Sequence, residues 1–121
     1  MKKLSLEKQL KEILEDYKDE VLDALKEEQT PVVTEAVKML KASSPKKRGK
    51  YASGWGYTTT KETPAMKQMV IHNKTHAGLT HLLERGHATR SGGRTVAQVH
   101  IKPVEEWSMN EYERRLIDRL S

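Results

Sequence analysis

The chain has 121 residues, a net charge of +5 and no cysteine, with 36% hydrophobic and 32% charged residues. Its length fits a single domain over residues 1–121, and two Trp, four Tyr and no Phe leave that domain a thin core. The missing cysteines exclude a disulfide framework and a thiolate zinc site. No apolar run approaches the roughly 20 residues that cross a bilayer. Charges follow Leu4 where a secretory signal would be apolar, so we expect neither a membrane span nor such a signal.

The charge is distributed unevenly along the chain. Residues 1–30 carry six lysines against nine acidic residues, and residues 103–121 carry three arginines against five acidic residues. Between them, residues 31–102 carry thirteen basic residues against three acidic ones. A basic middle between acidic ends favours an acidic partner or a neighbouring copy of the same chain, and nucleic acid is one candidate among several.

Residues 1–42 are expected to be helical. Apolar residues recur there at steps of three and four, which places them on one stripe of an α-helix. They are Leu6, Leu10, Ile13, Leu14, Tyr17, Val21, Leu22 and Leu25. Pro31 interrupts the pattern, because proline lacks an N–H and crowds the preceding turn, yet the stripe resumes at Val32. The segment is therefore either one helix kinked near Pro31 or two helices end to end.

A basic loop is expected over residues 43–50. Pro45 disfavours the helical conformation at the residue before it, so the helix ends there. The next five residues are Lys, Lys, Arg, Gly and Lys.

Residues 51–102 are expected to form a small, mostly antiparallel sheet with a short helix inserted. The first strand starts at Tyr51, and alternation of side chains puts Trp55 and Tyr57 on its core face. Gly54 falls on the opposite face, where it indicates a bulge or the close approach of another segment. The other elements are a strand at 66–73, a helix at about 76–85 and a strand at 95–102.

Residues 103–121 are expected to form a C-terminal helix that packs on the sheet. Pro103 suits the first turn of a helix, and acidic residues near the start with arginines near the end match the helix dipole. Helices and a small sheet in this order predict an α+β fold. The residues assigned to structural roles are Trp55, Tyr57, Leu82, Leu83, Gly86, Pro103 and Trp107. Among these, Gly86 is placed to end the short helix.

No catalytic site is expected in this chain. The best cluster of metal-ligand types is His81, Glu84 and His87. Gly86 should end the helix before His87, which leaves these side chains on separate elements. Residues 91–94 contain two glycines but lack the lysine and the following helix of a phosphate-binding loop. We therefore expect neither an enzyme nor a bound metal or other cofactor.

The basic loops are the stronger functional feature. Two of them collect charge of one sign, which favours contact with a partner. The candidate contact residues are Lys46, Lys47, Arg48, Lys50, Arg85, Arg90 and Arg94. A small nucleic-acid-binding module is the alternative, in which the same residues contact phosphates and exposed Tyr51 and Trp55 stack on bases. Burial of these two aromatics in the core would weigh against stacking.

Two stretches of the sequence resemble a known family. Residues 44–55, SPKKRGKYASGW, resemble the proline, basic turn, glycine and aromatic strand that follow the long first helix of that family. Residues 79–94, LTHLLERGHATRSGGR, and residues 100–107, HIKPVEEW, resemble its second signature. That signature is a Leu-Leu-Glu-x-Gly-His helix end, a Gly-Gly-Arg loop, a strand closing on Ile-x-Pro and a final helix. The family is the tail-completion, or head-to-tail joining, proteins of long-tailed bacteriophages and prophages.

The resemblance implies a structural protein that acts through protein–protein assembly at the neck or tail end of a virion. Its implied partners are the connector or adaptor, the tail tube or tail terminator, and copies of the same chain in a ring. Nucleic acid is a secondary partner in this view, and no membrane is involved. The resemblance also implies that the protein is present in the host cytoplasm during assembly and in the virion neck or tail afterwards.

Overall fold

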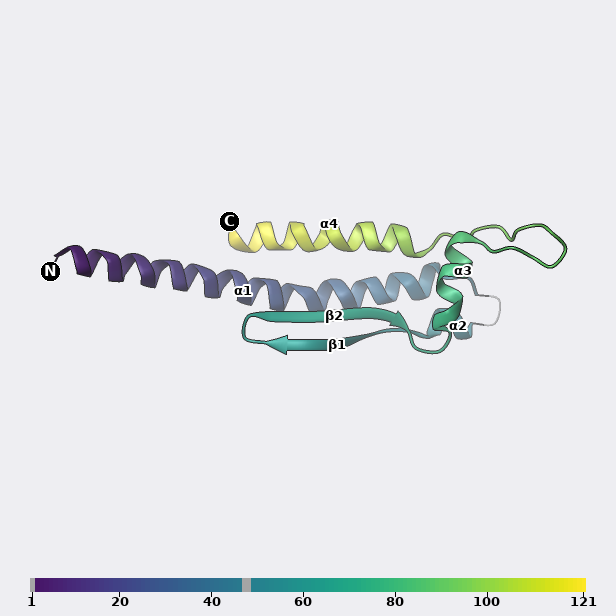
Figure 1. The fold of residues 1–121 in the computed structure, drawn as a ribbon, viewed down its shortest axis with the longest axis horizontal. Helices are drawn as coiled ribbons and strands as arrows, with labels where there is room; N and C mark the ends of the chain where they lie inside the picture. Colours follow the sequence, from purple (N-terminus) through teal and green to yellow (C-terminus); the bar gives the residue numbers. More distant parts are fainter. Residues whose placement is uncertain (1, 47–48) are drawn as a thin grey trace.

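The computed structural model describes residues 2–46 and 49–121 and has the predicted α+β fold (Figure 1). In chain order the elements are α1 (Lys2–Ser43), α2 (Lys50–Ser53), β1 (Trp55–Thr63), β2 (Met66–Asn73), the 3-10 helix η1 (Ala77–Leu79), α3 (Thr80–Arg85) and α4 (Ile101–Leu120). The hairpin of β1 and β2 and helix α4 both lie along the second half of α1, and the first half extends beyond them (Figure 1).

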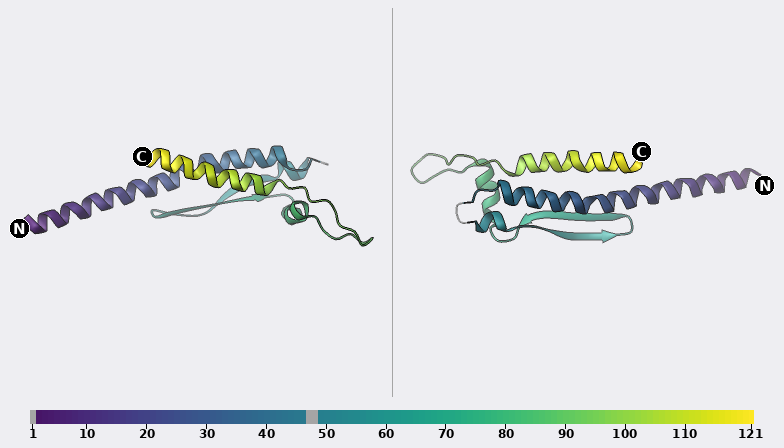
Figure 2. Two further views of the ribbon diagram at one scale, coloured as in Figure 1. Left: turned by 90° about the horizontal axis from the view of Figure 1, so that it is seen from above. Right: turned by 180° about the vertical axis from the view of Figure 1, so that it is seen from behind.

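Helix α1 runs without interruption through Pro31, so the alternative of two separate helices is wrong. Proline removes one backbone donor and crowds the turn before it, and a bend is the usual result. Figure 2 shows that the two halves of α1 run in slightly different directions. With a rise of 1.5 Å per residue, its 42 residues span about 63 Å. This length explains why the rest of the small chain covers only part of the helix.

The hairpin is held against α1 by hydrogen bonds near its turn. Lys26 Nζ donates to the carbonyl oxygen of Thr63 at 3.0 Å, and Gln29 Nε2 donates to that of Lys67 at 2.8 Å. A two-stranded antiparallel hairpin is marginally stable in water without a packing partner. Helix α1 therefore serves as the surface on which these two strands fold.

The third predicted strand, over residues 95–102, is wrong. Residues 95–100 are irregular, and Ile101 begins α4. The physical reason lies at the end of the segment, where the Glu84 carboxylate accepts hydrogen bonds from the backbone N–H groups of residues 100–102. Those donors are the ones that a strand would use for pairing, and their capture by a carboxylate starts a helix instead.

The first strand starts later than predicted. Tyr51 and the two residues after it form α2, so β1 begins at Trp55. A Cβ atom at Gly54 would lie 2.1 Å from Thr75 Oγ1, which confirms the close approach expected at this glycine. The placement of Tyr57 on the core face is wrong, because its side chain is 39% exposed. The strand leaves the core after its first residue.

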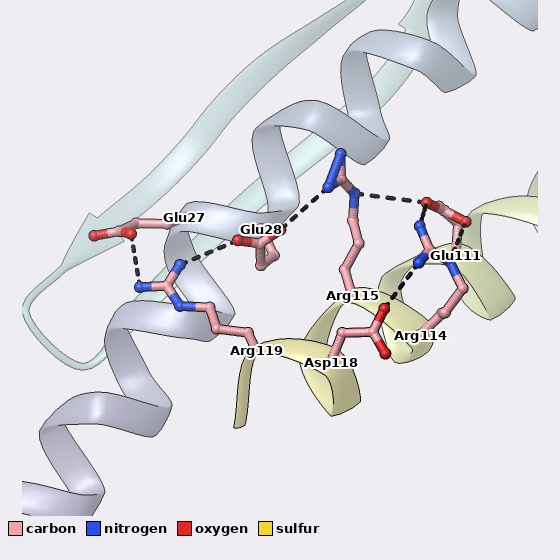
Figure 3. A network of polar contacts seen from close by, with 7 residues as sticks. All are labelled: Glu27, Glu28, Glu111, Arg114, Arg115, Asp118 and Arg119. Carbon is pink, nitrogen blue, oxygen red and sulfur yellow. Dashed lines mark hydrogen bonds and ion pairs between the residues drawn. The ribbon is translucent and has the colours of Figure 1, made fainter. Parts of the chain in front are cut away.

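Helix α4 packs along α1 instead of on the sheet, which differs from the prediction. Tyr112 Oη donates to the carbonyl oxygen of Leu25 at 2.7 Å. Near the end of α4, Arg119 pairs with Glu27 at 2.8 Å and with Glu28 at 3.1 Å (Figure 3). Helix α1 offers α4 an apolar stripe with acidic residues beside it, and these pair with arginines of α4.

The core lies where the end of α1, α2, the start of β1 and the start of α4 meet. Its buried members are Ala36, Val37, Leu40, Tyr51, Trp55 and Val104. Trp55 is 6% exposed, and its indole N–H donates to Ser44 Oγ at 2.7 Å. Leu83 and Trp107 are half-buried against this cluster, and Leu82 is also half-buried. The main buried cluster therefore lies at the C-terminal end of α1, and the contacts of α4 and the hairpin reach back as far as the middle of the helix.

Candidate interaction surfaces

Glu84 connects α3 to α4 and fixes the start of α4. Its Oε1 accepts the N–H groups of His100 at 2.7 Å and Ile101 at 2.9 Å, and its Oε2 accepts that of Lys102 at 3.0 Å. Partial burial acts to raise the pKa of this carboxyl, but the three backbone donors and the nearby His100 ring outweigh it and hold the pKa below its usual value. Pro103 occupies the first turn of α4, as predicted.

His100 links this helix start to the aromatic core. Its Nε2 lies 2.7 Å from Tyr51 Oη, and its Nδ1 lies 2.7 Å from the carbonyl oxygen of Gln98 and 3.1 Å from Glu84 Oε1. Because Nδ1 faces two acceptors, it carries a hydrogen, and Nε2 and the tyrosine hydroxyl share the other hydrogen bond of the ring. Burial, followed by the Glu84 charge, raises the pKa of Tyr51 to about 12, so the hydroxyl stays a donor at neutral pH.

These contacts hold both ends of a long loop, residues 86–100. Gly86 ends α3 with a φ of 73°, and a Cβ there would lie 2.5 Å from the carbonyl oxygen of Thr95, so only glycine fits. Further along, the carbonyl oxygen of His87 accepts the N–H of Thr95 at 2.8 Å, and Ala88 and Arg94 form an isolated antiparallel β-bridge. The loop therefore folds back on itself as a narrow projection from the body (Figure 1).

Most of the predicted contact residues lie at the end of the molecule that carries this loop (Figure 1). We call this the basic end and define it by five exposed residues: Lys46, Lys50, Arg85, Arg90 and Arg94. None of the five forms a salt bridge with another residue in the described part of the chain. The other two predicted residues, Lys47 and Arg48, lie outside the described residues.

The opposite end of the molecule is the first half of α1. We call residues 6–20 the α1 arm, and every one of them is exposed. Its apolar stripe is between 51% and 66% exposed and consists of Leu6, Leu10, Ile13, Leu14 and Tyr17. The arm holds six acidic residues and three lysines, a net charge of −3, and five of the acidic residues lie within residues 12–20. The sequence reveals this stripe through its periodicity, but not that the domain leaves it uncovered.

An apolar groove of about 440 Å³ opens between α4 and β2. Leu40 of α1, Ile71 of β2, and Val104 and Met109 of α4 contribute to its lining. The groove exists because α4 packs along α1 and leaves part of the hairpin uncovered. It is a further surface on which a partner could bury apolar area.

Of the three residues considered for metal binding, His81 is exposed, and the other two make other contacts. Glu84 caps α4, and His87 Nδ1 lies 3.1 Å from Thr95 Oγ1. Among the described residues, no three His, Asp or Glu side chains are grouped closely enough to hold a metal ion. None of the described helices has the length and hydrophobicity needed to span a bilayer.

Sequence reasoning did not identify Tyr51 and His100 as a buried pair. The available signal was a histidine three residues before the proline at the predicted helix start, but its partner 49 residues earlier is visible only in the fold.

Comparison of the chain with protein-family models, with curated proteins and with solved structures finds no match.

Proposed function

We propose that this protein is a structural subunit of a long-tailed bacteriophage or prophage, which acts by protein–protein assembly at the junction of head and tail or at the tail end. The resemblance of residues 44–55, 79–94 and 100–107 to the joining and tail-completion family supports this assignment. On this proposal the chain works as a virion component without catalysing a reaction.

One structural observation carries the proposal. The molecule is a rod with uncovered surfaces of opposite charge at its two ends, the α1 arm at one and the basic end at the other (Figure 1). An isolated protein gains nothing from holding five apolar side chains in water on an acidic helix. A subunit placed between other subunits uses such surfaces as contacts.

The burial of Tyr51 and Trp55 weighs against the nucleic-acid alternative. Both side chains lie in the core, with ring centroids 5.8 Å apart in an edge-to-face arrangement, so neither can stack on a base. The basic end would then contact phosphates without an adjacent stacking platform, which is a weaker arrangement for single strands.

The test is to delete the gene from a phage that encodes it. We expect full heads and complete tails to accumulate separately, and expression of the chain in the host to restore tailed particles, counted by electron microscopy. A deletion phage that attaches its tails normally would contradict the proposal.

A binding assay distinguishes the nucleic-acid module. A labelled duplex and a labelled single strand are titrated with the protein at two salt concentrations. We expect no submicromolar binding. Tight binding with a steep loss at higher salt would favour the module instead.

A further inference from the structure

We propose that the α1 arm of one copy docks on the loop 86–100 of a second copy, so that copies associate head to tail. The proposal rests on the assembly function above and names the surfaces that would join one copy to the next.

The α1 arm needs a partner for its apolar stripe. Ile13, near its middle, is 63% exposed, and the residues three or four positions away on the same face, Leu10 and Tyr17, are exposed too. A straight helix of 15 residues is about 23 Å long. Such a stripe is long enough to seat one short loop or helix of another chain.

The charge of the arm defines what kind of partner fits. Glu12, Asp16 and Glu20 are spaced four residues apart, so they follow one edge of the stripe beside Ile13 and Tyr17. Like charges at this spacing repel one another along a helix, and none of the three forms a salt bridge within the described residues. A basic surface would relieve that repulsion, whereas nucleic acid or an anionic membrane would add to it.

The loop 86–100 offers the matching combination of charge and apolar surface. Val96 is 84% exposed, Val99 is exposed as well, and Arg90 and Arg94 lie in the same loop. Arg85 stands just before the loop at the end of α3. Apart from Glu84, whose carboxylate caps α4, residues 63–104 contain no acidic residue. The loop thus combines exposed valines with positive charge, and the α1 arm combines exposed leucines and an isoleucine with negative charge. The two surfaces are complementary in both respects.

The positions of the two surfaces require two molecules. The α1 arm and the loop project from opposite ends of the rod (Figures 1 and 2), so they cannot meet within one copy. Contact between unlike surfaces is heterologous, and repetition of such a contact generates a closed ring or an open filament. Two arms paired with each other would instead bring together two surfaces that each carry a net charge of −3, from six acidic residues and three lysines, which disfavours a symmetric dimer through this face.

Cysteine cross-linking tests this contact directly, because the natural chain contains no cysteine. One full-length copy carries Ile13→Cys, and a second copy of different tag length carries Val96→Cys. They are mixed and treated with a short bismaleimide. We expect the 13–96 dimer to form several-fold more than a 13–117 dimer made with the control Ile117→Cys, an exposed apolar site on α4 that lies outside both surfaces. A 13–96 yield equal to the control, or a predominance of 13–13 dimers, would overturn the proposal.

A charge exchange tests the electrostatic part. Asp16→Lys with Glu20→Lys in the arm, or Arg85→Glu with Arg90→Glu at the basic end, should each cause loss of the 13–96 dimer. A chain that carries all four substitutions should regain it. The control pair Lys61→Glu and Glu113→Lys, both exposed and outside the two surfaces, should change nothing. Failure of the four-fold variant to regain the dimer, with circular dichroism unchanged, would contradict the contact.

The outcome is separable from that of the gene deletion. If the cross-link fails while the deletion phage still loses its tails, the assembly function stands and this docking mode falls. If the cross-link forms while the deletion phage attaches its tails normally, the docking mode stands and the assembly function at the neck or tail falls.

Discussion

The two halves of α1 have the same apolar periodicity but different surroundings. In the second half, Ala36, Val37 and Leu40 are buried against α2, β1 and α4. In the first half, residues 6–20 are all exposed. An amphipathic pattern therefore predicts which face of a helix is apolar. It does not predict whether that face is covered by the same chain or by another molecule.

The two halves of α1 also differ in whether their acidic residues are paired. Where α4 covers α1, Glu27 and Glu28 meet Arg119 of α4 (Figure 3). The six acidic residues of the α1 arm have no such counterpart in the described part of the chain. The covered half is thus internally neutralised, and the uncovered half keeps a charge that another molecule can use.

The largest expected effect is at the core of the covered half. Trp55→Ala removes a buried side chain and its bond to Ser44, so we expect a loss of about 3–5 kcal/mol in the free energy of unfolding. Urea denaturation measures it. The matched control is Tyr57→Ala, two residues along the same strand and 39% exposed, which should cost much less. Equal losses would mean that both rings are equally packed.

A pair of leucines on one helix tests the comparison itself. Leu40 is 3% exposed and Leu10 is 51% exposed. Leu40→Ala should lower the free energy of unfolding by about 2–5 kcal/mol, whereas Leu10→Ala should change it by no more than about 0.5 kcal/mol. Thermal or urea unfolding of the isolated protein measures both. A large loss for Leu10→Ala would indicate that the arm is already covered in solution.

Removal of the Glu84 charge should have an intermediate effect. Glu84→Gln weakens charge-assisted hydrogen bonds to the start of α4, and we expect a loss of about 1–3 kcal/mol in the free energy of unfolding. His81→Gln, one turn earlier on α3 and exposed, is the control and should be near neutral.

Acid pH should reproduce part of the Glu84 effect. Because its pKa is lower in the folded state than in the unfolded state, its contribution is fully present above the unfolded value of about 4.3. The contribution is lost as the pH falls through the lower folded value. The difference in stability between the natural chain and Glu84→Gln should therefore shrink below about pH 4. A constant difference down to pH 2 would contradict this role.

The smallest effect is expected at the exposed ion pairs. Arg119→Ala removes the contacts with Glu27 and Glu28 at the end of α4. Exposed pairs contribute little to stability and are screened by salt, so the urea midpoint should shift least in this variant. The remaining shift should vanish in 1 M salt. A shift as large as that of Glu84→Gln would show that the network is a principal support of α4.

Most of the helical framework and the class of the fold follow from local features of the sequence. Spacing of apolar residues placed the first helix, Gly86 marked the end of α3, and Pro103 marked the start of α4 to within two residues. These features are local, because periodicity, caps and breakers act within a few residues of one another.

The tertiary structure alone decided what each element contacts. Alternation predicted a strand at residues 95–102, but a carboxylate 16 residues before His100 converted its end into a helix. The position of α4 on α1 and the exposure of Tyr57 likewise depend on which surfaces remain after the hairpin has packed. Local sequence determines which face of a segment is apolar. Contacts between segments far apart in the chain determine what buries that face.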